Sequence, residues 1–224
     1  MATSDKKVQY TKWGLKMVGT KSIFDLDEPP WLPDEKVRRC LNCNEEFTTL
    51  LRRKHHCRRC GQVFCGTCVS KLPVYRMGFV DPQCVCKKCE ATCKAEEDFY
   101  EHHLKVLCKG AKFCLSDSKD PEQAYECCLS PDHLDILISD HEPVSIKSIL
   151  KIRMITGDSS QPQDSPALGF NKKSGSLKNI NGMHIQFSFG QEEKAMMLIC
   201  CANSKKQSAD WLRALKKALM LLRE

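Results

Sequence analysis

Apolar positions in the second half of the chain recur in short runs separated by turn residues. In residues 183–189, Met183, Ile185, Phe187 and Phe189 alternate with polar side chains. This period of two is typical of a strand with one buried face. Similar β-prone runs bounded by turn signals predict six strands, at 113–116, 126–129, 134–139, 144–156, 183–189 and 195–201.

The end of the chain follows a helical period instead. Ser208 has the character of an N-cap. The apolar residues after it keep to one side of a helix: Trp211, Leu215, Ala218, Leu219 and Leu222. Strands followed by one amphipathic helix predict a small β-sandwich or barrel with a C-terminal helix, over residues 108–224. Residues 157–178 are rich in Gly, Ser, Pro and Gln and predict a loop inside this domain.

The first half of the chain has a different texture. Residues 1–28 show no sustained period, which predicts a mobile N-terminal arm. Residues 29–93 begin with three prolines and contain few periodic apolar runs, so something other than a large core is expected to hold them together. Residues 90–107 contain no Gly or Pro and predict a helix, whose 94–107 part connects the two domains. The expected fold class is α+β.

The chain of 224 residues contains no run of 18 apolar residues, so no membrane span is predicted. The N-terminal sequence Met-Ala-Thr-Ser-Asp-Lys-Lys is not followed by the apolar core of a signal peptide. We therefore expect a cytoplasmic protein. In that compartment clustered cysteines are expected to bind metal rather than to form disulfides.

Cysteine is the outlier of the composition, with 16 residues, and eight of them form four Cys-x2-Cys pairs. Each pair can direct two sulfurs to one ion, and Zn²⁺ takes four such ligands, so two closed structural zinc sites per chain are predicted. The gap between the second and third pairs is only 4 residues, which favours alternating pairing. The first site is then Cys40, Cys43, Cys65 and Cys68, and the second is Cys57, Cys60, Cys86 and Cys89. The other eight cysteines are interpreted as small buried apolar residues.

Between the first two pairs lies a dense cationic segment. Residues 52–59 contain four Arg, one Lys and two His, directly after Leu50 and Leu51. Apolar side chains beside cations are typical of a membrane-surface site, where each leucine contributes on the order of 1.5–3 kcal/mol if fully buried. Each nearby Lys or Arg adds about 1 kcal/mol against an anionic leaflet. Protonated imidazoles donate through both nitrogens, so binding is expected to strengthen as the pH falls.

Two motifs resemble those of FYVE zinc fingers. Trp31-Leu32-Pro33-Asp34 resembles the W-x-x-D motif, and residues 53–61, Arg-Lys-His-His-Cys-Arg-Arg-Cys-Gly, resemble the R-[RK]-H-H-C-R-x-C-G signature. The resemblance implies a reader of phosphatidylinositol 3-phosphate on early endosomal membranes. It also implies that Asp34 accepts from inositol hydroxyls and that Leu50 and Leu51 insert into the membrane. The phosphates would be held by Arg53, Lys54, His55, His56 and Arg58.

The resemblance has two departures. The third family motif, R-V-C, reads Cys84-Val85-Cys86, so its phosphate-contacting Arg is missing. One lost charge-assisted contact costs on the order of 1.5–3 kcal/mol. The nearby cations that could partly compensate are Arg76, Lys87 or Lys88. The gap between the first and second Cys-x2-Cys pairs is also one residue longer than is usual in the family.

The order of modules resembles a small two-domain member of the same family, whose C-terminal half is pleckstrin-homology-like. That resemblance implies endosomal and adhesion-site roles in cell adhesion and migration. The second domain is interpreted as a scaffold for protein partners, since it lacks a dense Lys and Arg pattern.

Three other classes of protein share part of this pattern. A RING-type ubiquitin ligase also uses a cross-brace, but its middle pairs usually include a histidine ligand. A zinc-finger protein-interaction module with weak lipid specificity remains an alternative. A nucleic-acid-binding finger would need a basic recognition helix or stacking platform, so no nucleic acid is expected. The sequence contains no recognisable catalytic constellation, and a non-enzymatic adaptor is predicted.

Overall fold

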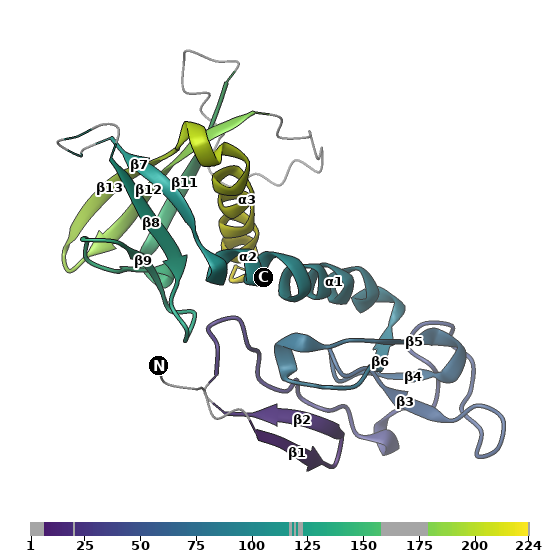
Figure 1. Ribbon diagram of the computed structural model, residues 1–224. Coiled ribbons are helices and arrows are strands. Elements are labelled where there is room, and N and C mark those ends of the chain that lie inside the picture. Colours follow the sequence, from purple (N-terminus) through teal and green to yellow (C-terminus); the bar gives the residue numbers. More distant parts are fainter. Residues whose placement is uncertain are drawn as a thin grey trace. The chain divides into compact units, whose positions relative to one another are not determined.

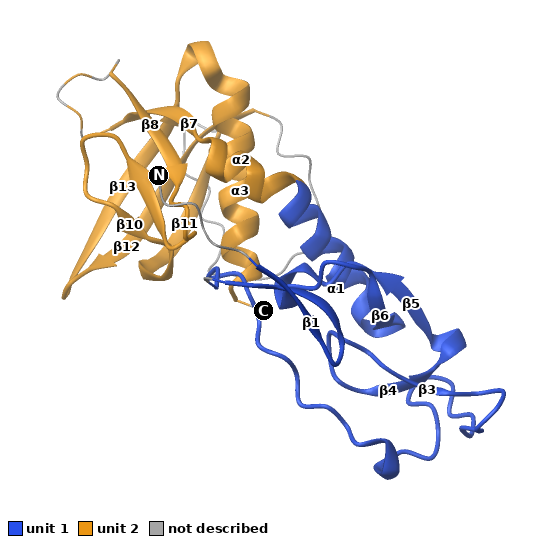
Figure 2. Cartoon of the chain, turned by 60° about the horizontal axis from the view of Figure 1, so that its bottom comes forward, with its two compact units in different colours: residues 1–101 blue, residues 102–224 orange. Residues whose placement is uncertain are grey.

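The computed structural model describes residues 7–19, 21–116, 118, 120, 123–157 and 179–223. The chain divides into two compact units, Met1–Glu101 and His102–Glu224 (Figure 2). The boundary between them falls within the connecting helix predicted at 94–107. Apart from Gly157, the loop predicted at 157–178 lies outside the described residues. None of the described helices has the length and hydropathy that a membrane-spanning segment requires.

The first unit is built from three two-stranded antiparallel sheets and a helix (Figure 1). The strand pairs are β1 (Lys7–Thr11) with β2 (Gly14–Val18), β3 (Lys54–His56) with β4 (Val63–Cys65), and β5 (Val69–Leu72) with β6 (Gln83–Cys86). Helix α1, Lys87–Asp98, follows β6 directly. The buried centre of the unit combines cysteine ligand positions with a few larger apolar side chains such as Phe64, Val74 and Phe79.

The β1–β2 hairpin corrects the expectation for the N-terminal arm. Residues 1–28 were expected to lack regular structure, which is wrong for residues 7–18. The hairpin is completed by neighbours distant in sequence, because Met17 donates to the carbonyl of Gly78 at 2.8 Å and Val80 donates to that of Leu15 at 3.0 Å. Further along the arm, Phe24 is fully buried and packs edge-on against Phe99. The arm therefore belongs to the folded finger.

The helix predicted at 90–107 is confirmed and extends further in both directions. Helix α1 passes into a π-helical turn at Phe99–His103, which is followed by α2, Leu104–Lys109. The helix ends at Gly110, whose φ of +82° suits glycine. A Cβ at this position would also lie 2.8 Å from the carbonyl oxygen of Cys127. Glycine is thus required both by the backbone angle and by the close approach of a strand.

The second unit is one antiparallel sheet of seven strands with a C-terminal helix. Its strands are β7 (Ala111–Leu115), β8 (Ala124–Leu129), β9 (Asp135–Ile138), β10 (Val144–Ser145), β11 (Ile149–Thr156), β12 (Ile180–Phe189) and β13 (Glu192–Cys200). Their spatial order is β10-β9-β8-β7-β13-β12-β11. Helix α3, Lys205–Leu221, packs on this sheet, and its fully buried Trp211 meets Phe113 of β7 edge-on (Figure 1). The predicted α+β class, with strands preceding a terminal helix, is confirmed.

Three details of the predicted pattern are wrong. Residues 144–156 do not form one strand, because a 3-10 turn at Ile146–Ser148 separates β10 from β11. Ser208 is not the N-cap of α3, which begins three residues earlier; its hydroxyl instead donates to the carbonyl of Lys112 at 2.7 Å. Phe189 is 46% exposed at the end of β12, although its register in the alternation predicted burial.

Candidate functional site: two zinc centres and a cationic surface

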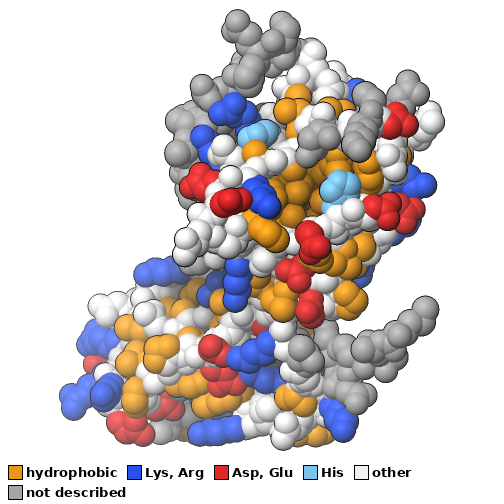
Figure 3. Space-filling view, turned by 90° about the vertical axis from the view of Figure 1, so that its left-hand side faces the viewer, with side chains coloured by type: hydrophobic (Ala, Val, Ile, Leu, Met, Phe, Trp, Pro, Cys, Tyr) orange, Lys and Arg blue, Asp and Glu red, His pale blue; other side chains and the backbone are white. Residues whose placement is uncertain are grey.

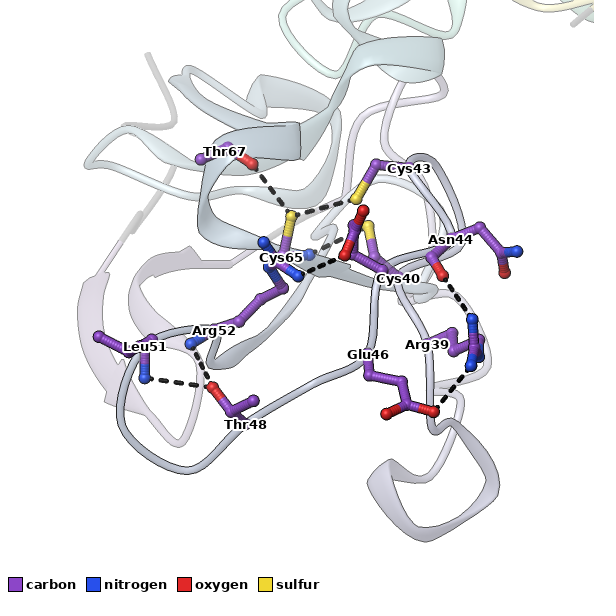
Figure 4. A network of polar contacts seen from close by, with 11 residues as sticks. Arg39, Cys40, Cys43, Asn44, Glu46, Thr48, Leu51, Arg52, Cys65 and Thr67 are labelled. Carbon is purple, nitrogen blue, oxygen red and sulfur yellow. Dashed lines mark hydrogen bonds and ion pairs between the residues drawn. The ribbon is translucent and has the colours of Figure 1, made fainter.

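The first four-cysteine cluster joins the first and third Cys-x2-Cys pairs. The sulfurs of Cys40, Cys43, Cys65 and Cys68 all lie within 4.8 Å of one another. Cys43 Sγ and Cys65 Sγ are 3.7 Å apart. Four sulfurs around Zn²⁺ at about 2.3 Å have edges of about 3.8 Å, so this spacing fits a tetrahedral zinc site. The amide of Cys65 donates to Cys40 Sγ at 3.3 Å, which stabilises thiolate charge (Figure 4).

The second cluster joins the second and fourth pairs. It contains Cys57, Cys60, Cys86 and Cys89, again with sulfurs within 4.8 Å of one another, and Cys60 Sγ and Cys86 Sγ are 4.0 Å apart. Cys57 is fully buried. Cys86 ends β6 and Cys89 lies in the first turn of α1, so this centre fastens the helix to the sheet.

The alternating pairing predicted from the short gap is confirmed. Each centre has four thiolate ligands, which fill the tetrahedral positions of a structural Zn²⁺. Eight thiolates and two zinc ions contribute −8 and +4 charges, so the formal net charge of the chain falls from +7 to +3. On the face drawn in Figure 3, Lys and Arg side chains lie among acidic and apolar ones. Attraction for anions must therefore come from a local arrangement.

The other cysteines follow the predicted burial only in part. Cys93 and Cys127 are buried, and burial raises the pKa of each thiol to about 12. Cys108 is exposed, so its expected burial is wrong. The remaining ones are partly exposed, namely Cys84, Cys114, Cys128, Cys200 and Cys201.

Within the cationic segment, two arginines are engaged by carboxylates of the finger itself. Arg52 pairs with Glu45 at 2.8 Å. Arg59 pairs at 3.0 Å with Glu96, a buried residue of α1. Arg52 and Arg59 are also the two arginines of the segment for which the family resemblance implies no phosphate contact. The positive charge left for a bound anion is carried by Arg53, Lys54 and Arg58.

Strand β3 divides the predicted headgroup residues between two faces. Lys54 and His56 lie on one face, where Lys54 Nζ donates to the carbonyl of Asp34 at 2.6 Å. His56 Nε2 lies 2.7 Å from the carbonyl oxygen of Leu32 and 3.8 Å from Asp34 Oδ1. His55 lies on the opposite face, next to Gly66, where a Cβ would be 3.5 Å from its Nε2. Asp34, Lys54 and His56 are thus brought together, and His55 is not among them.

Arg58 lies on the side of His56 and is flanked by aromatic rings. Its guanidinium carbon is 5.3 Å from the ring centroid of Trp31 and 5.1 Å from that of Trp13. Its Nη1 donates to the carbonyl of His56 at 3.0 Å, and its amide donates to that of Cys84 at 2.8 Å. Trp13 was missed by the sequence analysis. The only signal was a tryptophan next to a lysine in an otherwise polar stretch.

Leu50 and Leu51 project from a loop fixed by its own backbone. Leu50 is 81% exposed and Leu51 is 96% exposed. The hydroxyl oxygen of Thr48 accepts from the amides of Leu51 and Arg52, and the amide of Thr48 donates to the carbonyl of Arg52. In Figure 4, Leu51 lies at the outer edge of this loop, away from the cysteine sulfurs. The loop therefore holds two apolar side chains in solvent beside Arg53.

The structure also shows which cations could take the place of the missing third-motif arginine. Arg76 is buried; it donates through Nε to the carbonyl of Phe24 at 2.7 Å and pairs with Glu96 at 3.5 Å. It is a structural residue and cannot replace the missing arginine. The exposed Lys71 is the direct cross-strand partner of Cys84 in the β5–β6 pair, so both side chains share one face.

Comparison with known proteins agrees with this description. Residues 30–95 match the FYVE zinc finger, so the two centres define a FYVE-type finger rather than a RING. Residues 98–224, more than half of the chain, match the family described as zinc finger FYVE domain-containing protein 21 C-terminus, and the chain belongs to this family. Both are typically non-catalytic binding modules.

Two solved structures are similar to the finger. The VHS and FYVE tandem domains of Hrs, a protein involved in membrane trafficking and signal transduction, show 43% identity over 30% of this chain and 30% of that chain, with a TM-score of 0.27. The LM5-1 FYVE domain from Leishmania major shows 35% identity over 31% of this chain and 83% of that chain, with a TM-score of 0.28.

Proposed function

We propose that the protein is a non-enzymatic adaptor that binds phosphatidylinositol 3-phosphate on early endosomal membranes through its finger. The observation that carries this proposal is the juxtaposition of two almost fully exposed leucines with a zinc-braced cationic segment. Apolar side chains that enter the bilayer interface and cations that meet phosphate are complementary requirements of a lipid-headgroup site.

The headgroup site is assigned to the residues that the finger leaves available. Asp34 is positioned to accept from inositol hydroxyls, since its carboxylate is near His56 but 53% exposed. Arg53, Lys54, His56 and Arg58 would hold the phosphates, and His55 would contribute from the other face of β3. An arginine offers two parallel donors to phosphate, whereas a lysine offers a point charge. Lys71, across from Cys84, supplies such a charge in place of the absent third-motif arginine.

The second unit is proposed to be pleckstrin-homology-like and to recruit protein partners in trafficking linked to adhesion and migration. Its strand order, with β7 joining two runs of sequential strands and α3 packed on the sheet, supports this assignment. The substitution of Cys84 for arginine favours one alternative, a protein-interaction module with weak lipid specificity.

Co-sedimentation with vesicles distinguishes a specific reader of phosphatidylinositol 3-phosphate from a protein-interaction module with weak lipid specificity. The full chain should bind phosphatidylcholine vesicles that contain phosphatidylinositol 3-phosphate much more strongly than vesicles of equal charge that contain phosphatidylserine. Equal binding to both would contradict the proposed specificity and support the alternative. Zinc content, measured in parallel, verifies that the finger is folded in each sample.

A further inference from the structure

The tip of the β1–β2 hairpin lies at the cationic surface, although it precedes the segment that matches the FYVE finger. Thr11 and Gly14 face each other in the hairpin register, which leaves Lys12 and Trp13 as its tip. The hydroxyl of Thr11 donates to the carbonyl of Gly14 at 2.7 Å and accepts from the amide of Trp13 at 3.2 Å. The conformation of the tip is therefore fixed locally.

The hairpin is also fixed to the finger along its length. Besides the backbone bonds of β2 with residues 78–80, Lys16 pairs with Glu28 and lies over the ring of Phe79. Near the tip, Gly14 packs so closely on Gln83 that a Cβ on Gly14 would lie 2.9 Å from the side-chain nitrogen Nε2 of Gln83. Gln83 precedes Cys84 in β6. The tip is thus attached next to the strand in which the third-motif arginine is absent.

Trp13 forms an aromatic wall beside Arg58. Its indole stacks on that of Trp31, with ring centroids 4.4 Å apart and planes inclined by 19°, and it is 6.1 Å from the His56 ring. The Arg58 guanidinium lies at similar distances from both indoles. Such stacking holds the guanidinium in one orientation without using its N–H donors. Nη1 donates to the carbonyl of His56, and Nη2 is the group that is left for an anion.

Lys12 adds a second cation at the same place. Its Nζ lies 4.8 Å from the Trp13 ring centroid, and its side chain is exposed. The carboxylate of Glu28, next to Trp31, accepts from Lys16 and from the indole N–H of Trp31, so it is already engaged. The ammonium group of Lys12 and the guanidinium group of Arg58 therefore both lie within about 5 Å of the Trp13 ring centroid.

We propose that the hairpin tip forms part of the headgroup site, where Lys12 contacts a phosphate group of an inositol phosphomonoester held by Arg58. Trp13 is a positioning residue that keeps both cations in place. The inference rests on the proposed function and extends it. The lipid-binding site would then combine the hairpin tip with residues of the FYVE finger that lie further along the chain. The ligand chemistry is that of an inositol ring with phosphates at positions 1 and 3, either in a lipid or as the free inositol bisphosphate.

The test compares Lys12→Ala and Trp13→Ala with Lys7→Ala in the full chain. Lys7 is an exposed lysine at the other end of the same hairpin, so Lys7→Ala removes the same charge without touching the tip. Binding is measured to vesicles containing phosphatidylinositol 3-phosphate and, by calorimetry, to soluble inositol 1,3-bisphosphate. Lys12→Ala should weaken both about five- to tenfold, and Lys7→Ala should change them less than about twofold.

The outcomes separate this inference from the proposed function. If the unmodified protein does not prefer the phosphorylated lipid, the proposed function fails first. If it does, and Lys12→Ala behaves like Lys7→Ala toward both ligands, the hairpin tip is not part of the site. A loss on vesicles with unchanged affinity for the soluble headgroup also overturns the inference, because it indicates general attraction to the membrane. Tighter binding by Trp13→Ala would identify the tip as a cover over the site and would equally overturn it.

Discussion

Both Nε and Nη2 of Arg59 lie 3.0 Å from the same carboxylate oxygen of Glu96. Glu96 is 1% exposed, and Arg76, which is 4% exposed, approaches the same oxygen at 3.5 Å. One acidic side chain of α1 therefore neutralises two arginines of the finger. Arg59 lies between the zinc ligands Cys57 and Cys60, and Arg76 also donates to the carbonyl of Phe24 in the N-terminal arm. Segments distant in sequence are therefore linked through one carboxylate.

Glu96→Gln should destabilise the finger strongly, because it leaves two buried or half-buried guanidinium groups without a counter-charge. Breaking a buried ion pair from one side costs about 3–5 kcal/mol. Glu90→Gln is the matched control on the same helix, since Glu90 pairs with the exposed Lys94 and its replacement should leave the stability of the finger almost unchanged. Amide hydrogen exchange of finger peptides, with zinc present, measures both. Equal effects of the two variants would contradict the central role of Glu96.

Removal of zinc should unfold the finger and leave the second unit folded. Structural zinc contributes on the order of 10–16 kcal/mol in small fingers, far more than the few apolar side chains around the centres can replace. The second unit has its own core, which includes Phe113, Leu198 and Trp211. After a strong chelator, exchange protection should disappear in residues 37–98 and persist in α3. Loss of protection in both regions would show that the units do not fold independently.

The double change Leu50→Ala and Leu51→Ala should weaken binding to vesicles without altering zinc content. Partial burial of two leucines in the interface accounts for about 1–3 kcal/mol, or roughly a 5- to 150-fold loss of affinity. Leu134→Ala with Leu150→Ala provides the control, because these leucines are 39% and 45% exposed in the second unit. If the control pair weakened binding as much, membrane contact would not be confined to the Leu50–Leu51 loop.

Tyr75→Phe should lower the stability of the finger at neutral pH and have no effect at strongly alkaline pH. The hydroxyl of Tyr75 donates to Glu101 at 2.7 Å, and this hydrogen bond, followed by burial, raises the pKa of Tyr75 to about 12. An unfolded tyrosine titrates near pH 10, so the contribution is complete below about pH 10 and is lost as the pH rises through the folded pKa.

At neutral pH the expected cost of Tyr75→Phe is about 1 kcal/mol, because the pair is partly exposed. Chemical denaturation across this pH range measures it. Tyr10→Phe, at a tyrosine that is 85% exposed, should leave stability unchanged throughout. A cost of Tyr75→Phe that persists above pH 12 would exclude the hydrogen bond as its source.

The zinc centres could be predicted from the sequence because their geometry is set by local spacing. Only 4 residues separate Cys60 from Cys65, and so short a gap favours directing the two pairs to different ions. The terminal helix was predictable for a similar reason, since its apolar stripe is continuous in sequence. Its start was not, because Ser208 bonds to Lys112 of β7 and Ser204 precedes the first turn.

The hairpin could not be predicted, since its stability comes from partners distant in sequence. Residues 7–18 contain no strong alternation, and their order depends on backbone bonds to Gly78 and Val80 and on the Trp13–Trp31 stack. The motif that named both His55 and His56 as ligands likewise contained no information on which face of β3 each would occupy.

The buried Phe24 has a practical consequence for binding measurements. A recombinant fragment that starts at residue 30, where the family match begins, would lack the ring that covers Phe99 and the carbonyl that accepts from Arg76. Such a fragment would expose apolar surface and would also lack Lys12 and Trp13. If the hairpin tip belongs to the headgroup site as proposed, affinities determined with this fragment will be lower than those of the intact protein. A fragment that keeps the hairpin begins no later than Lys7.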